Sequence, residues 1–283
     1  MNISDTSSYI LSVFESGHFD LDKWKTYMDT HIPGAKELCL RDMENCIGAG
    51  CSWRDDFLPV LNEVFTDLHG REKAVGSFRE VTDNLDARIT EVFGKNVETD
   101  IVLYIGLCNG AGWVTTVNKK TTVLLGIEKI MELDWCGIDD MTGLIIHELG
   151  HVYHTQHGLF GCDADSPQDK LLWQLFTEGV AMVFEQTVIG DNEYFHQDKN
   201  GWKSWCDEHA ELIKESFSED FRNMTEKNQR YFGDWVSFEG QPDTGYYLGA
   251  LFVRHLLRYD SFDEIIKYDI QKVRNGYYGF SAE

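Results

Sequence analysis

Three residues in the middle of the chain have the types and spacing of a metal centre. His147, Glu148 and His151 form an HExxH motif within the segment LIIHELGHVYHTQHG. Histidines four residues apart lie on one face of an α-helix, where both imidazoles can bind one ion. Glu148 lies about 100° around the helix from His147, where it can take a proton from a metal-activated water. The motif therefore predicts metal-assisted hydrolysis.

Two further histidines follow the motif. The interval from His147 to His157 is that of the metzincin pattern, which has a glycine at the position of His154 so that the chain can turn. Histidine accepts a positive φ poorly. If the helix continues instead, His157 lies ~9 Å beyond His151 along the axis, too far to share an ion. We expect His154 and His157 to lie outside the ligand set.

A third ligand is needed, because a catalytic zinc takes three protein ligands and leaves one position for water. Glu178 lies in LLWQLFTEGVAMVFEQ, an apolar segment with helical periodicity. A carboxylate on such a surface is costly to bury unless it is paired or binds a metal. Gly179 and Ala181 beside it leave room for another helix. We expect one Zn2+ ion, bound by His147, His151 and Glu178.

The HExxH motif followed by a helix with Glu-Gly-x-Ala resembles the gluzincin metallopeptidases, whose zinc ligands are two histidines and a glutamate. The chain is similar to a group of poorly characterised bacterial zinc-dependent peptidases, and distantly similar to aminopeptidase N and thermolysin. The resemblance covers residues 100–258. The interval from His151 to Glu178 is longer than in thermolysin or aminopeptidase N.

A later segment, TGYYLGALFVRHLL, resembles the Tyr-x-x-Gly start of a helix in aminopeptidase N-like gluzincins. The resemblance implies that Tyr246 stabilises the oxyanion of the reaction and that Gly249 packs this helix against a neighbour. Tyr247 is the alternative, because adjacent tyrosines point to different faces.

The resemblance also implies a strand at a sheet edge that binds the substrate through main-chain hydrogen bonds. The glycine-rich segment CNGAGWVTT supplies Gly110, Ala111, Gly112 and Trp113 for this role, and their backbone N–H groups would also face the oxyanion. Glycine permits a close approach of the substrate. An ordinary loop explains the segment equally well.

Two features depart from the family pattern. The GAGW segment has no acidic residue to bind a peptide N-terminus, and no aspartate follows Glu178 where thermolysin-like enzymes orient the first histidine. Asp163, Asp165 and Glu239 are candidates for orienting the histidines. Aminopeptidase and endopeptidase specificity both stay open.

Several segments must position these residues. We expect helices over residues 55–68 and 77–94, a strand in DIVLYIGL, and a hairpin around Asn118–Lys120. Asp139 or Asp140 would cap the motif helix and Gly158 would end it. The fold class is α+β and mainly helical, with a small sheet packed on the HExxH helix and a C-terminal helical lobe, as in zincins. We expect regions 1–98, 99–158 and 159–283 within one compact unit.

Composition restricts the partners and the compartment. A formal net charge of −23 argues against nucleic-acid and anionic-membrane partners. The start of the chain has no basic segment followed by an apolar run, and no stretch approaches the ~20 apolar residues of a membrane span. Seven cysteines without CxxC spacing indicate a reducing compartment, so we expect a cytoplasmic protein.

The sequence thus predicts a zinc-dependent hydrolase that cleaves peptide bonds in a peptide or small protein substrate. One alternative is an inactive zincin-fold binding or sensor protein, which a fourth protein ligand such as Cys162 or His154 would favour. The other is a zinc hydrolase of a non-peptide substrate. The sequence carries no signal for the oligomeric state.

Overall fold

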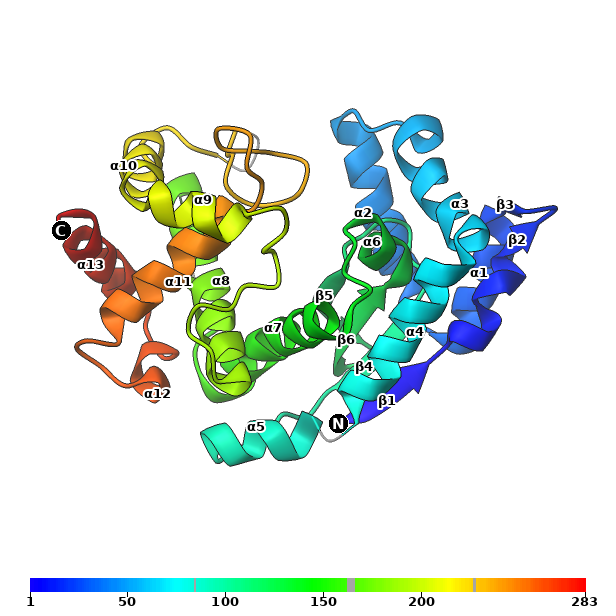
Figure 1. The fold of residues 1–283 in the computed structure, drawn as a ribbon, viewed down its shortest axis with the longest axis horizontal. Helices are drawn as coiled ribbons and strands as arrows, with labels where there is room; N and C mark the ends of the chain where they lie inside the picture. Colours follow the sequence, from blue (N-terminus) through cyan, green and yellow to red (C-terminus); the bar gives the residue numbers. More distant parts are fainter. Residues whose placement is uncertain (84, 162–165, 226–227) are drawn as a thin grey trace. The chain divides into compact units, whose positions relative to one another are not determined.

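The computed structural model describes residues 1–283 apart from 84, 162–165 and 226–227 (Figure 1). The chain forms two compact units, Met1–Glu148 and Leu149–Glu283, and the division falls within a single helix. Most described residues are helical and a small mixed sheet accompanies them, which confirms the predicted α+β, mainly helical class. The division into regions 1–98, 99–158 and 159–283 stays a prediction.

The first unit holds the sheet and a set of helices. In chain order its elements are β1 (Asn2–Asp5), η1 (Ser7–Val13), β2 (Phe14–Glu15), β3 (His18–Phe19), α1 (Leu21–His31), α2 (Lys36–Ala49), η2 (Trp53–Phe57), α3 (Leu58–Thr66), α4 (Leu68–Thr82), α5 (Leu85–Phe93), β4 (Asp100–Tyr104), β5 (Gly112–Val117), β6 (Lys120–Gly126), α6 (Ile127–Glu132) and the first part of α7 (Ile138–His157). Helices α3 and α4 both pack against α6.

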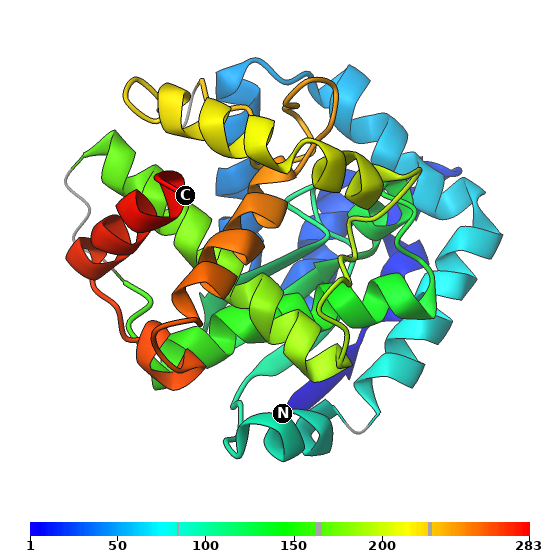
Figure 2. The ribbon, with the colours of Figure 1, turned by 60° about the vertical axis from the view of Figure 1, so that its left-hand side comes forward.

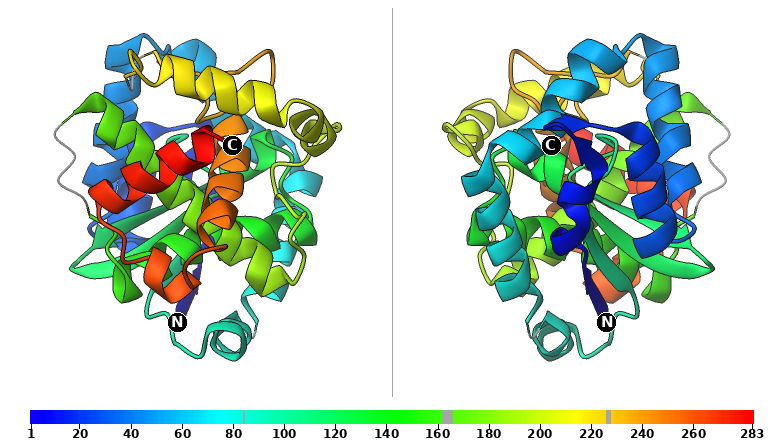
Figure 3. Two further views of the ribbon diagram at one scale, coloured as in Figure 1. Left: turned by 90° about the vertical axis from the view of Figure 1, so that its left-hand side faces the viewer. Right: turned by 90° about the vertical axis from the view of Figure 1, so that its right-hand side faces the viewer.

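The main sheet has the strand order β1-β4-β6-β5. Strands β1, β4 and β6 are parallel, and β5 pairs antiparallel with β6 at one edge. Figure 3 shows the dark blue β1 beside the green strands, so the beginning of the chain contributes to this sheet. The predicted hairpin is confirmed: Asn118 and Lys119 form a two-residue turn with φ of 49° and 68°. Two left-handed residues match the twist of the paired strands.

The helix predicted over residues 55–68 is divided in the structure. Residues 53–57 form a π-helical turn, and α3 ends before Asp67. The Asp67 side chain accepts the backbone N–H of Gly70 at 3.0 Å and so caps the start of α4. A carboxylate in this position favours a new helix start over continuation.

The second unit is helical. After the remainder of α7 it contains α8 (Pro167–Ile189), α9 (Trp202–Glu208), α10 (Ala210–Asp220), α11 (Thr244–Leu256), α12 (Phe262–Ile265) and α13 (Ile270–Ser281). The yellow-green α8 and the orange α11 cross in close contact (Figure 2). A Cβ at Gly179 would lie 2.2 Å from the Gly249 carbonyl oxygen, so the two glycines let the backbones meet. This confirms that both glycines serve helix packing.

Within the described ranges, no helix has the length and apolar character that crossing a membrane requires. The six described cysteines are free thiols.

Candidate metal centre

Helix α7 carries the HExxH motif and spans Ile138–His157. Asp139 and Asp140 lie in its first turn, so the expectation that one of them is the N-cap is wrong; their charges face the positive end of the helix dipole instead. The helix ends before Gly158, as predicted. A Cβ at Gly158 would lie 2.1 Å from the Ile266 carbonyl oxygen, so close chain packing requires the glycine there.

The predicted ligands come together on α7 and α8. Nε2 of His151 lies 3.2 Å from Oε2 of Glu178. His147, His151 and Glu178 each offer a ligand atom within 4.8 Å of the others. Ligands about 2.0–2.1 Å from a tetrahedral zinc ion are about 3.3 Å apart, so this nitrogen–oxygen distance fits a shared ion.

Close contact between the two helices explains this arrangement. Gly150 precedes His151, and a Cβ on it would lie 2.9 Å from the Cα of Ala181. Glu178 is three residues before Ala181 and therefore lies on the same side of α8. Ser166 and Pro167 fix the start of α8, because the Ser166 side chain accepts the N–H of Asp169 at 3.1 Å.

A second group of ligand atoms also includes His147. Glu185 and His196 lie with it inside the same 4.8 Å limit, and all three side chains are buried. Nδ1 of His196 lies 3.0 Å from each oxygen of Glu185. This pair was not predicted from the sequence, although Glu185 lies two turns after Glu178 on the same face of an apolar helix.

The other histidines of the motif helix have different surroundings. His154 is fully buried, with its ring against Phe160, Trp173 and Phe176. Burial lowers its pKa to about 4, so it is a neutral core residue at pH 7. His157 is the last residue of α7, with its ring 4.6 Å from that of Tyr153. Among the described residues, neither joins a three-ligand group.

Glu148 lies against the start of the edge strand β5. A Cβ at Gly112 would lie 2.8 Å from both Cγ and Oε1 of Glu148. Gly112 therefore gives the glutamate room, which differs from the predicted role of giving room to a substrate. Of the other predicted substrate residues, Ala111 accepts the N–H of Gly126 at 3.0 Å, and Trp113 donates its indole N–H to the Tyr104 hydroxyl at 3.1 Å.

The two adjacent tyrosines of α11 differ in their contacts. Tyr247 is buried, and its hydroxyl donates to Oδ1 of Asp207 at 2.9 Å. That bond occupies the Tyr247 hydroxyl with an exposed carboxylate, which also pairs with Lys203. Tyr246 is half-buried in the first turn of the helix, with its ring 5.9 Å from that of Phe232. It shares a helix face with Gly249, which packs on α8 next to Glu178. Tyr246 thus remains the candidate.

Glu239, another predicted participant, is in neither of the ligand groups found among the described residues. Glu239 is exposed, with Oε1 3.9 Å from Nη1 of Arg230. Asp163 and Asp165, and the alternative ligand Cys162, lie outside the described residues.

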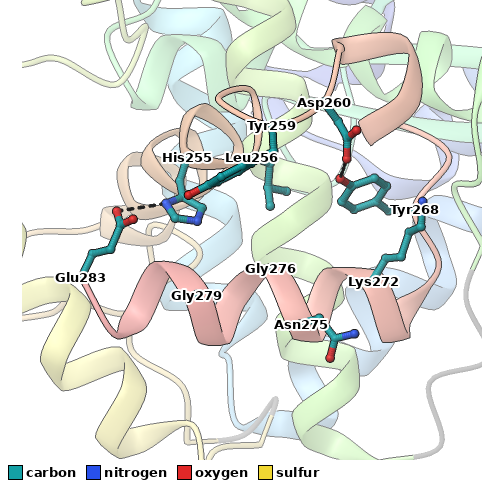
Figure 4. Close-up of a pocket in the computed structure, with 10 residues that line it drawn as sticks. All are labelled: His255, Leu256, Tyr259, Asp260, Tyr268, Lys272, Asn275, Gly276, Gly279 and Glu283. Atoms are coloured by element: carbon teal, nitrogen blue, oxygen red, sulfur yellow. Dashed lines mark hydrogen bonds and ion pairs between the residues drawn. The ribbon is translucent and has the colours of Figure 1, made fainter.

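A separate pocket lies along α13 in the second unit (Figure 4). Gly276 and Gly279 form its floor, and its acidic groups are paired: Glu283 with His255 at 3.2 Å, and Asp260 with the Tyr268 hydroxyl. It shares no residue with either group of candidate ligands.

No family model, curated protein or solved structure matches the chain.

Proposed function

We propose that the protein is a zinc-dependent hydrolase and that its substrates are peptides or small proteins. The observation that carries this proposal is the 3.2 Å separation of His151 Nε2 and Glu178 Oε2, within a group that includes His147. Glu148 follows the first of these histidines on the same helix. A purely structural metal centre needs no such carboxylate beside its ligands.

A zinc ion held by these three side chains would polarise a carbonyl and lower the pKa of a water. Glu148 accepts the proton from the attacking water and delivers it to the leaving amine. Tyr246 donates a hydrogen bond to the oxyanion. The free edge of β5, with Gly110 at its approach, binds the substrate main chain.

The Glu185–His196 pair complements this assignment. A carboxylate near a ligating histidine fixes the orientation of its ring and raises its basicity. Glu185 is fully buried, offers a ligand atom within 4.8 Å of one from His147, and lies 3.0 Å from Nδ1 of His196. We assign to this pair the orienting role for which Asp163, Asp165 and Glu239 were candidates.

The proposal includes the cellular compartment and the kind of partner. The free thiols of the described cysteines are compatible with a reducing compartment, and we propose that the protein is cytoplasmic. A net charge of −23 makes nucleic acid an unfavourable partner.

Zinc titration of the Glu178→Ala variant tests the ligand set. Loss of one ligand from three should weaken zinc binding at least about 100-fold. The control is Glu215→Ala, which removes an exposed glutamate from α10 and should bind zinc like the wild type. Unchanged zinc affinity in Glu178→Ala would refute the assignment.

Hydrolysis of a mixed peptide library by the zinc-loaded wild type tests the activity. Cleavage that a chelator abolishes and zinc restores supports a peptidase. Zinc binding without cleavage would contradict it and would favour a binding protein or a hydrolase of another bond.

A further inference from the structure

Glu128 is a buried carboxylate that the proposed reaction does not use. It lies in the first turn of α6 and its side chain is 1% exposed. Its Oε2 accepts the backbone N–H of Gly106 at 2.8 Å, and its Oε1 accepts that of Cys108 at 3.1 Å. Burying a carboxylate is costly unless its oxygens are hydrogen-bonded. Both oxygens of Glu128 bind one segment, the connection between β4 and β5.

The backbone around Glu128 fits its side chain closely. A Cβ at Gly106 would lie 2.6 Å from Oε1 of Glu128, and one at Gly126 would lie 3.1 Å from the same atom. The segment also contains two residues with positive φ, Cys108 at 55° and Gly110 at 151°. A non-glycine residue in the left-handed region is strained unless its surroundings hold it there. Glu128 supplies the hydrogen bond that holds Cys108.

Further contacts hold the segment at Ile105, where it begins, and at Asn109, within it. The Trp24 indole donates to the Ile105 carbonyl at 2.9 Å, and the side chain of Asn109 donates to the Cys39 carbonyl at 3.0 Å and to Asp42 at 2.9 Å. The segment then leads into Gly112, which touches Glu148.

We propose that Glu128 is a positioning residue that holds residues 105–111 so that Gly112 places the Glu148 carboxylate for proton transfer. The inference rests on the proposed function, because it assigns a base role to Glu148. Glu128 fixes the backbone beside Glu148 whatever the substrate is. Small displacements of a catalytic group are costly in rate.

The test compares Glu128→Gln with the wild-type protein. The amide has nearly the same shape but only one acceptor oxygen, so one of the two N–H groups loses its partner. We expect amide exchange in residues 105–111 to be faster by about tenfold. We also expect kcat to fall by about tenfold or more, with full zinc content and a cooperative unfolding transition whose midpoint is lower, because one buried N–H group is left unpaired.

Two further variants separate the effect of Glu128 on the backbone from the effect of Gly112 on Glu148. Glu132→Gln, an exposed change on the same helix, should leave both exchange and kcat unchanged. Gly112→Ala should lower kcat by direct contact with Glu148, without faster exchange at Gly106 and Cys108.

Unchanged exchange in Glu128→Gln, or faster exchange with an unchanged kcat, would overturn the inference. A parallel loss of zinc or of folding would also overturn it, because it would show a general structural role. If the wild type hydrolyses no peptide, the proposed function fails separately. Crystal structures then decide: displacement of the Glu148 carboxylate in Glu128→Gln supports the inference, and an unmoved carboxylate refutes it.

Discussion

The contact between Glu148 and Gly112 gives the general base a defined place beside a strand edge. The Glu148 side chain is 7% exposed, so few water molecules compete for its carboxylate. The Glu148→Gln variant keeps the shape of this side chain but cannot accept the proton. We expect kcat to fall by about 100-fold or more while zinc affinity stays at the wild-type value. Steady-state kinetics and zinc analysis of the same samples check this, and full activity in Glu148→Gln would contradict the proton-transfer role.

The second prediction concerns His154 and the pH dependence of the unfolding free energy. Its folded-state pKa of about 4 lies below the ordinary value of 6.5, because burial disfavours the charged ring. The unfolded chain therefore binds a proton before the folded chain does, and His154 reduces stability as the pH falls from 6.5 towards 4. Relative to His154→Leu, wild-type protein without zinc should lose about 2 kcal/mol of unfolding free energy between pH 7.5 and 5.

Urea denaturation of both proteins at each pH measures this difference. Equal pH dependence of the two proteins would show that His154 is not a buried neutral residue.

At this scale, sequence reasoning could identify some site residues and not others. His147, Glu148 and His151 are recognisable by local spacing, and Glu178 by a carboxylate on an apolar helix. Glu185 and His196 could not be paired, because no sequence spacing relates a helix residue to the loop that folds back on it.

At the scale of the elements, helix packing depends on glycines that permit backbone contact. A Cβ at Gly179 would meet the Gly249 carbonyl oxygen, so Gly179→Ala must separate α8 from α11. We expect a loss of about 1–3 kcal/mol in the unfolding free energy. Gly76→Ala is the control, since an exposed glycine in α4 with nothing within 4 Å should gain about 0.5–1 kcal/mol.

Thermal and chemical denaturation of both variants measure the two effects. A Gly179→Ala protein as stable as the wild type would mean that α8 and α11 leave room for a Cβ at Gly179, which would contradict the close contact with Gly249.

Most elements that position the site follow from the sequence. The long apolar periodicity of α8 and α11 and the turn at Asn118–Lys119 depend on local chemistry. Strand β1 was not predicted, because a four-residue segment, NISD, has no pattern of its own and becomes a strand by pairing with β4. The helix predicted over 77–94 is divided for a similar reason: Asp83 is extended, which no periodicity shows.

At the scale of the whole molecule, zinc binding and folding must be linked. The proposed ligands lie on two helices, and the unfolded chain does not hold them together. Free zinc at 100 times its dissociation constant should raise the unfolding free energy by about 2.7 kcal/mol. Glu148→Gln should show the same gain and Glu178→Ala should show little of it. Denaturation with and without zinc tests this, and an equal gain in Glu178→Ala would place the ion elsewhere.

The most direct test of the account is the position of the ion itself. The structure offers two groups of ligands that share His147, one with His151 and Glu178 and the other with Glu185 and His196. Anomalous diffraction at the zinc absorption edge from crystals of the zinc-loaded protein distinguishes them. We predict a single peak bound by His147, His151 and Glu178, beside Glu148. A peak between Glu185 and His196, or no peak at either group, would contradict the proposed catalytic centre.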